Sequence, residues 1–201
     1  MRNITITIRD IPIKVVYKRI RNLRLTISLR SRSVNVSSPY HVSLDTVYNF
    51  VETRYDWIAK HLENIPIVDK IEYKLGSTMP VFGSQRLIKS HQDLDSIKSE
   101  FMEYIKQQVK QNSQTLNVIV KGIKIKPLKS RWGSCNTLDK VITLNFYLVH
   151  STHEIINYVL YHEMVHLLVT GHNQEFYSYI KSKFPNYKIL DAQLKELQAR
   201  L

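Results

Sequence analysis

Hydrophobic and polar residues alternate along most of the first forty positions of the chain. The alternating apolar residues are Ile4, Ile6, Ile8, Leu23, Leu25, Ile27, Leu29, Val34 and Val36. A two-residue period is that of a strand with one buried face, and the pattern stops at Ser38 and Pro39, a pair that favours a turn. This pattern predicts β structure over most of residues 1–40.

The period changes to that of an amphipathic helix after Ser43, which is a predicted N-cap. One long helix is expected over 44–62 and a second over 94–114, both with apolar residues three or four positions apart. Proline and glycine between them favour short strands and turns. Two further strands are expected over 118–125 and 141–144.

The change from strands to helices near residue 92 predicts an α+β fold with two regions. Residues 1–92 are expected to form a β-rich region with one long helix, and residues 93–201 a mainly helical region. The chain has 201 residues, of which 43% are hydrophobic and 23% are charged. These values are typical of a globular protein with one compact domain or two small ones.

The formal charge of the chain is +12, and the excess is concentrated near its beginning. Only one acidic residue, Asp10, accompanies nine basic residues there: Arg2, Arg9, Lys14, Lys18, Arg19, Arg21, Arg24, Arg30 and Arg32. This surface is compatible with simple solvation or with docking of nucleic acid or a nucleotide. The sequence shows no aromatic stacking platform and no helix-turn-helix in support of docking.

The compartment is indicated by cysteine usage and by the lack of targeting segments. Cys135 is the only cysteine, so no intramolecular disulfide can form, which favours a reducing compartment. No apolar run approaches the ~20 residues of a membrane span, and the N-terminus lacks the apolar core of a secretion signal. We therefore expect a cytoplasmic protein without a membrane partner.

The most informative residues are His162, Glu163 and His166, which form an H-E-x-x-H motif. On a helix, positions i and i+4 share one face, so both imidazoles can reach one metal ion at ~2.0–2.1 Å. The glutamate between them can take a proton from a metal-activated water and deliver it to the leaving group. The motif thus predicts a zinc hydrolase in which Glu163 is the general base.

The residues around the motif predict the helix that it requires. Ser151 and Glu154 have the S-x-x-E spacing of a capping box, and Gly171 is well placed to end the helix. Apolar residues on most sides make this helix a buried one. Two histidines and a glutamate are costly to bury without partners, and a metal ion supplies a partner.

His172 is the predicted third zinc ligand, because a turn after Gly171 can bring it back toward the motif. Asn173 is a predicted cap of a following helix that buries Phe176 and Ile180. Three histidines with one open position form a catalytic zinc arrangement. Glu175 is the alternative third ligand.

The segment Arg-Trp-Gly-Ser-Cys at 131–135 joins two predicted strands upstream of the motif. One interpretation is a tight turn at Gly133 with Trp132 as a core residue. The other is a cleft wall, in which Arg131 orients an anionic or carbonyl group and Ser134 forms a hydrogen bond near the metal. Cys135 is disfavoured as a fourth ligand, because it would close the site.

Two tyrosines of the motif helix, Tyr158 and Tyr161, are further candidates for substrate binding. Each lies close to His162 in sequence. Arg131, Tyr158, Tyr161 and a neighbouring histidine are all candidates to stabilise an oxyanion, and the sequence does not choose among them.

These motifs together resemble the YgjP-like metallopeptidase family, whose members are similar to SprT-like zincin proteases. The residues that carry the resemblance are Arg131, Trp132, Gly133, Ser134, Cys135, Asn145, Tyr158, the HEMVH run, His172, Phe176, Pro185 and Tyr187. The resemblance covers nearly the whole chain; one departure is the stretch between Gly83 and Leu94, which is short for the family. It implies a zincin-like C-terminal half packed with the strand-rich half, zinc on His162, His166 and His172, and catalysis by Glu163.

Three functions are compatible with this sequence. The leading interpretation is a zinc-dependent metallopeptidase that acts on a peptide or protein substrate. The second is a metal-dependent phosphohydrolase acting on nucleotides, which lacks a P-loop signature and a carboxylate cluster for Mg²⁺. The third is a nucleic-acid-associated zinc protease, which is supported only by the basic charge of the chain.

Overall fold

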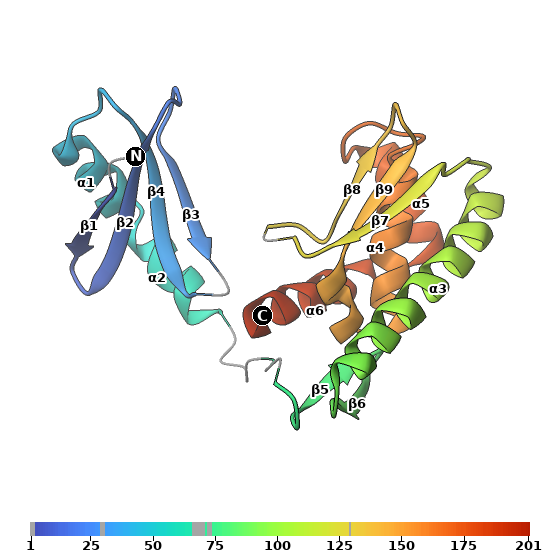
Figure 1. The fold of residues 1–201 in the computed structure, drawn as a ribbon. Coiled ribbons are helices and arrows are strands. Elements are labelled where there is room, and N and C mark those ends of the chain that lie inside the picture. Colours follow the sequence, from blue (N-terminus) through green and yellow to red (C-terminus); the bar gives the residue numbers. More distant parts are fainter. Residues whose placement is uncertain (1–2, 29–30, 66–70, 72–73, 129) are drawn as a thin grey trace. The chain divides into compact units, whose positions relative to one another are not determined.

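A computed structural model of the chain describes residues 3–28, 31–65, 71, 74–128 and 130–201. The chain forms two compact units (Figure 1): the first holds residues 1–70 and 198–201, and the second holds residues 71–197. Leu29, a predicted strand residue, lies outside the described residues. The predicted division near residue 92 stays a prediction, because compactness does not decide which segments fold independently.

The first unit is a four-stranded sheet with two helices on one face. Its strands are β1 (Asn3–Ile8), β2 (Ile11–Lys18), β3 (Arg24–Ser28) and β4 (Ser33–Pro39). Their order is β1-β2-β4-β3, with β2 and β4 parallel and the outer pairs antiparallel. The strands predicted in this region are confirmed, and the alternation directs Ile13, Val15 and Tyr17 of β2 into the core.

The prediction of a single helix over 44–62 is wrong. The chain instead forms α1 (Leu44–Glu52) and α2 (Tyr55–Glu63). The helix is interrupted where the N–H of Arg54 donates to the carbonyl of Val51 at 2.9 Å, a three-residue bond that tightens the last turn. The predicted N-cap is confirmed, since the Ser43 side chain accepts a hydrogen bond from the Thr46 N–H.

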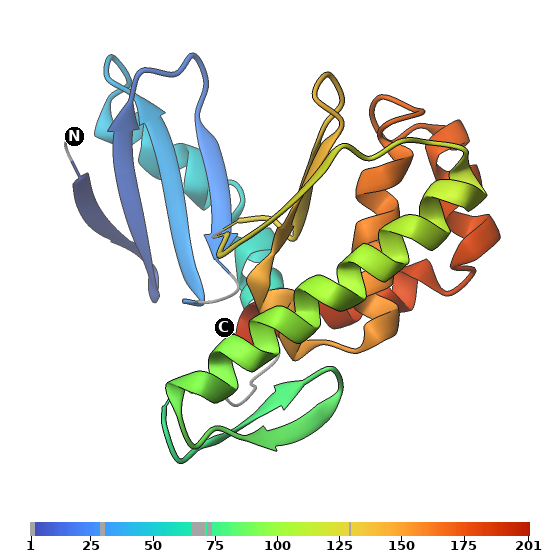
Figure 2. The ribbon, with the colours of Figure 1, turned by 45° about the vertical axis from the view of Figure 1, so that its right-hand side comes forward.

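The second unit combines a hairpin, a three-stranded sheet and four α-helices (Figure 2). The hairpin is β5 (Thr78–Val81) with β6 (Ser84–Leu87), followed by α3 (His91–Leu116). The sheet consists of β7 (Gly122–Lys126), β8 (Gly133–Asn136) and β9 (Val141–Asn145) in the order β7-β9-β8. The 3₁₀ turn η1 (Phe146–His150) then leads to α4 (His153–Val165), α5 (Gln174–Lys183) and α6 (Tyr187–Arg200).

Most of the predicted elements of this unit are confirmed. The helix expected over 94–114 is α3, and the strand expected over 141–144 is β9. The strand expected over 118–125 begins only at Gly122, so its first four residues are not strand. The mixed α and β architecture, with strands early and helices late, agrees with the predicted class at this level. No helix in the described part of the chain is long and apolar enough to span a membrane.

Helix α4 is the central element of the second unit. It contacts α3, α5, β8 and β9, and nine of its thirteen residues are buried. The predicted cap at Ser151 is wrong, because the Ser151 hydroxyl bonds the preceding turn and the Thr152 side chain accepts from the Ile155 N–H. The helix also ends at Val165, earlier than the predicted end near Gly171.

Buried Asn145, at the end of β9, fixes the segment that leads into β8. Its amide donates to the carbonyls of Leu128 and Arg131 at 2.9 and 3.0 Å. Its carbonyl oxygen accepts from the N–H groups of Leu128 and Tyr147 at 3.1 and 3.2 Å. One side chain therefore satisfies four backbone groups and holds Leu128 and Arg131 beside the end of β9.

Replacing Asn145 by Ala removes four hydrogen bonds and leaves four partly buried backbone groups without this partner. We expect the free energy of unfolding to fall by about 2–4 kcal/mol, measured by urea denaturation. Asn64→Ala is the matched control, because Asn64 is exposed and bonds only one carbonyl of its own helix. A loss no larger for Asn145 than for Asn64 contradicts this role.

Candidate metal centre

Three imidazoles converge at the end of α4. His162 lies in the last turn of the helix, His166 is its C-cap, and His172 follows on the loop before α5. Their ligand nitrogens all lie within 4.8 Å of one another, and the Nε2 atoms of His162 and His172 are 3.0 Å apart. Among the described residues, this is the only group of three or more potential metal-ligating side chains so placed.

The ring of Phe176 contacts all three imidazoles. Its ring centroid lies 4.8 Å from His162, 4.8 Å from His166 and 4.7 Å from His172, and its side chain is fully buried. The ring is positioned by Asn173, whose side chain accepts from the Phe176 N–H and caps α5, as predicted. The sequence predicted that Phe176 is buried, but the contact with all three rings was missed.

The hydrogen-bonding and charge state of the histidines suit a metal ion. The Nδ1 atom of His166 lies 3.3 Å from the carbonyl oxygen of Val169. A carbonyl only accepts, so Nδ1 carries the proton and Nε2 keeps its lone pair. Burial lowers the pKa of His162 to about 4, with smaller contributions from His166 and His172. The pKa of His166 is also lowered, chiefly by burial. Neutral imidazoles are the form that binds metals.

The spacing of the nitrogens also fits a metal. Tetrahedral coordination with bonds of ~2.0–2.1 Å separates neighbouring ligand atoms by roughly 3.3–3.4 Å. The observed separations, from 3.0 Å to at most 4.8 Å, bracket this value. Small side-chain adjustments suffice to bind one ion.

Glu163 lies beside the imidazoles and is buried, with only 8% of its surface exposed. Burial raises the pKa of its carboxyl group to about 7, against a smaller lowering by the Arg131 guanidinium. A carboxyl group that titrates near neutrality can both accept and return a proton.

Strand β8 passes unusually close to Glu163. A Cβ atom on Gly133 would lie 2.6 Å from Cγ, 2.7 Å from Oε1 and 2.9 Å from Cδ of Glu163. These distances are shorter than van der Waals contact, so the backbone of β8 approaches the carboxylate only because residue 133 has no side chain. The structure therefore does not show the turn that was one interpretation of Gly133; the glycine lies in a strand against the candidate base.

The cavity next to Glu163 has a volume of about 210 Å³. Its lining residues are Arg131, Trp132, Gly133, Tyr158, Val159, His162, Glu163, Asp191 and Leu194. The structure thus brings the candidate residues Arg131 and Tyr158 together with the motif. The Tyr158 hydroxyl donates to Asp191 of α6 at 2.8 Å, and burial together with this carboxylate raises the pKa of Tyr158.

Asp191 was missed by the sequence analysis. It lies 25 residues after His166 on a separate helix, and no local pattern connects it with the motif. The only available signal was the need of a buried tyrosine hydroxyl for a partner.

The other candidates lie away from this cavity. Ser134 lines a second depression, which shares Arg131 with this cavity, and the alternation of β8 directs its side chain away from the face on which Gly133 meets Glu163. Tyr161 is buried against Phe184, and the Lys183 amine lies 5.0 Å from the centre of its ring. Glu175 is exposed on α5 and is not part of the histidine group.

Cys135 is half-buried near Glu163. Burial, with a contribution from Glu163, raises the pKa of its thiol to about 11. The thiol is therefore protonated at neutral pH, the form that neither attacks nor binds metals well.

Two metallopeptidase zymogens are among the solved structures that the chain resembles. Abylysin of Pyrococcus abyssi is 21% identical, with a TM-score of 0.41 over 45% of this chain and 90% of its own. Jannalysin of Methanocaldococcus jannaschii is 27% identical, with a TM-score of 0.41 over 48% of this chain and 90% of its own. No curated protein sequence matches the chain.

A family model gives the broader match. The model described as YgjP-like, metallopeptidase domain, matches residues 21–100 and 94–197, which together include every strand from β3 onward and the histidine cluster. The resemblance inferred from the sequence motifs is confirmed by this match. The chain belongs to the YgjP-like family of metallopeptidase domains.

Proposed function

We propose that the protein is a zinc-dependent peptidase, with His162, His166 and His172 as ligands and Glu163 as the general base. The observation that carries the proposal is the convergence of three imidazoles beside a buried carboxylate. Three nitrogen donors with room for a further ligand are the donor set of catalytic zinc. Zinc in such a site polarises a carbonyl oxygen and acidifies water.

Glu163 supplies the proton transfers. It lines the cavity and is too close to β8 to move in that direction. With a pKa near 7, its carboxylate takes the proton of the attacking water and passes it to the leaving amine. The Tyr158 hydroxyl and the Arg131 guanidinium border the same cavity and are assigned to substrate binding.

The free edge of β8 favours a peptide as the substrate. Within the described residues, β8 pairs only with β9, and the Asn145 N–H bonds the Trp132 carbonyl at 2.8 Å. In an antiparallel ladder the pairing alternates, so the backbone groups of Gly133 and Cys135 point away from β9. An extended peptide can add to this edge and place its backbone beside Glu163.

The same arrangement, a motif helix beside a sheet with a free edge strand, supports the assignment of the second unit to the zincin-like fold.

The alternative function, a metal-dependent phosphohydrolase, has less support. No cluster of carboxylates able to hold Mg²⁺ occurs in the part of the chain that the structure describes.

We expect purified protein to bind about one zinc ion per chain. His162→Ala, His166→Ala and His172→Ala should each weaken zinc binding by orders of magnitude, measured by chelator competition, because one of three ligands is lost. His41→Ala, an exposed histidine of the first unit, is the control. If His172→Ala binds zinc like the parent and Glu175→Ala does not, Glu175 is the third ligand.

Glu163→Gln should keep the zinc content and the thermal midpoint but lose hydrolysis. Glutamine has nearly the same size and cannot take up the proton, so turnover of a peptide library should fall by ~10²–10⁴-fold. The comparison requires equal zinc content in both proteins. Undiminished turnover at equal zinc content excludes Glu163 as the base.

Gly133→Ala tests the close approach of β8 to Glu163. The new methyl group overlaps Cγ of Glu163, so we expect a loss of about 1–3 kcal/mol in the free energy of unfolding and a large loss of turnover. Unfolding of the apo protein is then compared in the Glu163→Ala background, where the obstructing atoms are gone.

In the Glu163→Ala background, Gly133→Ala should lower the free energy of unfolding much less than it does in the parent protein. A coupling of at least about 1 kcal/mol is the expected result of this double-mutant cycle. Additive losses would show that Gly133 is required for another reason. Because the cycle measures stability alone, its outcome does not depend on the choice of substrate.

A further inference from the structure

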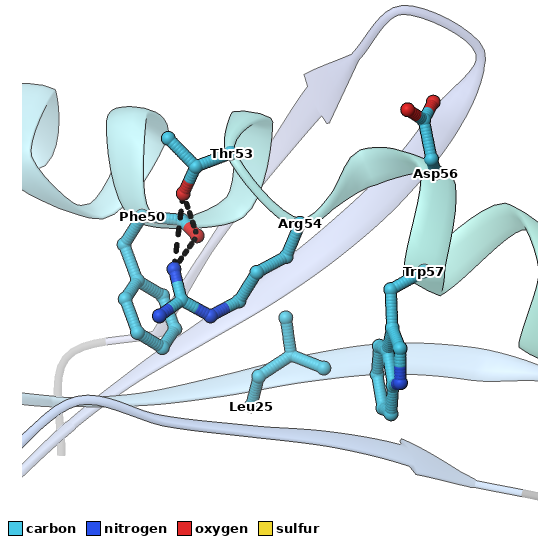
Figure 3. A pocket seen from close by; sticks show the side chains of 6 residues that line it. All are labelled: Leu25, Phe50, Thr53, Arg54, Asp56 and Trp57. Carbon is cyan, nitrogen blue, oxygen red and sulfur yellow. Dashed lines mark hydrogen bonds between the residues drawn. The ribbon is translucent and has the colours of Figure 1, made fainter.

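The first unit has a pocket of its own, with a volume of about 490 Å³. Figure 3 shows it between the end of α1, the start of α2 and strand β3. The lining residues are Leu25, Phe50, Thr53, Arg54, Asp56 and Trp57. The pocket therefore joins apolar and aromatic groups with one cationic and one anionic side chain.

Trp57 forms one wall of this pocket and is unusually exposed for a tryptophan, at 49%. Its indole packs against the imidazole of His61 on the same helix, with the ring centroids 3.8 Å apart and the ring planes inclined by 33°. Figure 3 shows the indole edge-on beside Leu25, with Arg54 on the other side of the pocket. A flat ring that enters here can stack on the indole and contact Leu25. The structure thus offers an aromatic surface at Trp57, although the sequence pattern revealed no stacking platform.

Arg54 forms the opposite wall and is held in place. Its Nη1 donates to the Phe50 carbonyl at 2.9 Å and to the Thr53 hydroxyl at 3.0 Å. Its guanidinium carbon lies 4.0 Å from the centre of the Phe50 ring. Both of these hydrogen bonds come from Nη1, so the N–H groups at Nη2 and Nε can donate to a ligand. The same bonds fix the position of the guanidinium before a ligand arrives.

Further positive charge lies at the end of β3 where this pocket is located. Leu25 is the second residue of β3, so the connection from β2 enters beside it. Arg19 and Arg21 of this connection are exposed, and neither forms an ion pair among the described residues, whereas Arg24 extends from the face of β3 opposite to Leu25. Asp56 is the one acidic residue of the pocket, and its side chain points away from the other lining residues in Figure 3.

We propose that this pocket binds single-stranded nucleic acid, with one base stacked on Trp57 and the adjoining phosphates paired with Arg54 and the arginines around β3. A single strand presents a flat ring and a negative charge in every repeat, which matches an exposed indole beside unpaired arginines. An acidic peptide carries negative charge to match the arginines, but it does not present a flat ring in every repeat to match the exposed indole of Trp57. A duplex keeps its bases stacked inside and does not reach Trp57.

The test is fluorescence anisotropy of labelled oligo(dT), oligo(U) and a duplex of equal length, with the full chain, at low and physiological salt. Trp57→Ala should weaken single-strand binding about tenfold or more, and Trp57→Phe should retain most of it. Tyr48→Ala is the matched control, because Tyr48 is similarly exposed at 43% on α1 and does not line the pocket. Arg19→Ser and Arg21→Ser should each reduce the salt slope by about 0.7.

Quenching of tryptophan fluorescence by the oligonucleotide, lost in Trp57→Ala, is the expected signature of stacking. Tighter binding of either oligo(dT) or oligo(U) than of the duplex supports the proposal and identifies the nucleic acid. Failure to bind at low salt, equal binding of the duplex, an unchanged affinity in Trp57→Ala, or displacement by poly-glutamate but not by unlabelled oligonucleotide would each overturn it.

Discussion

Helix α4 lies so close to strand β8 that the side chain of Glu163 occupies the space where residue 133 would otherwise carry a Cβ atom. This contact determines much of the second unit. It excludes water from the carboxylate, which raises the pKa of Glu163, and it brings the edge of β8 next to the histidine motif. The position of β8 depends in turn on Asn145, three of whose four hydrogen bonds hold Leu128 and Arg131, which precede this strand. The helix, the edge strand and the cavity are thus parts of one packing arrangement.

The histidine cluster is organised in a similar way around a single apolar side chain. Phe176 touches all three imidazoles, and Asn173 fixes Phe176 by capping the helix on which it lies. The rings are therefore oriented by packing before any ion is bound, and the carbonyl of Val169 selects the tautomer of His166. Preorganisation of this kind lowers the cost of ordering the ligands.

The sequence predicted those features that depend on residues close together in the chain. The H-E-x-x-H motif, the cap at Ser43, the cap at Asn173 and the strand alternation are local patterns, and the structure has each of them. The contacts of Gly133 with Glu163 and of Tyr158 with Asp191 join residues 30 or more positions apart, and no local pattern encodes them. The break near Arg54 was missed for another reason. The apolar stripe continues through it at helical spacing, while a single backbone bond ends the helix.

The three imidazoles differ in how firmly the fold holds them. His162 and His166 belong to the end of a buried helix, whereas His172 lies on an exposed loop just after Gly171, which has a φ of +77° and no neighbour within 4 Å of its Cβ position. A metal ion held by these three side chains would join the end of the buried helix to the exposed loop before α5. Such an ion would add a cross-link between two segments that are otherwise connected through Gly171, and its binding would stabilise the folded conformation of the loop.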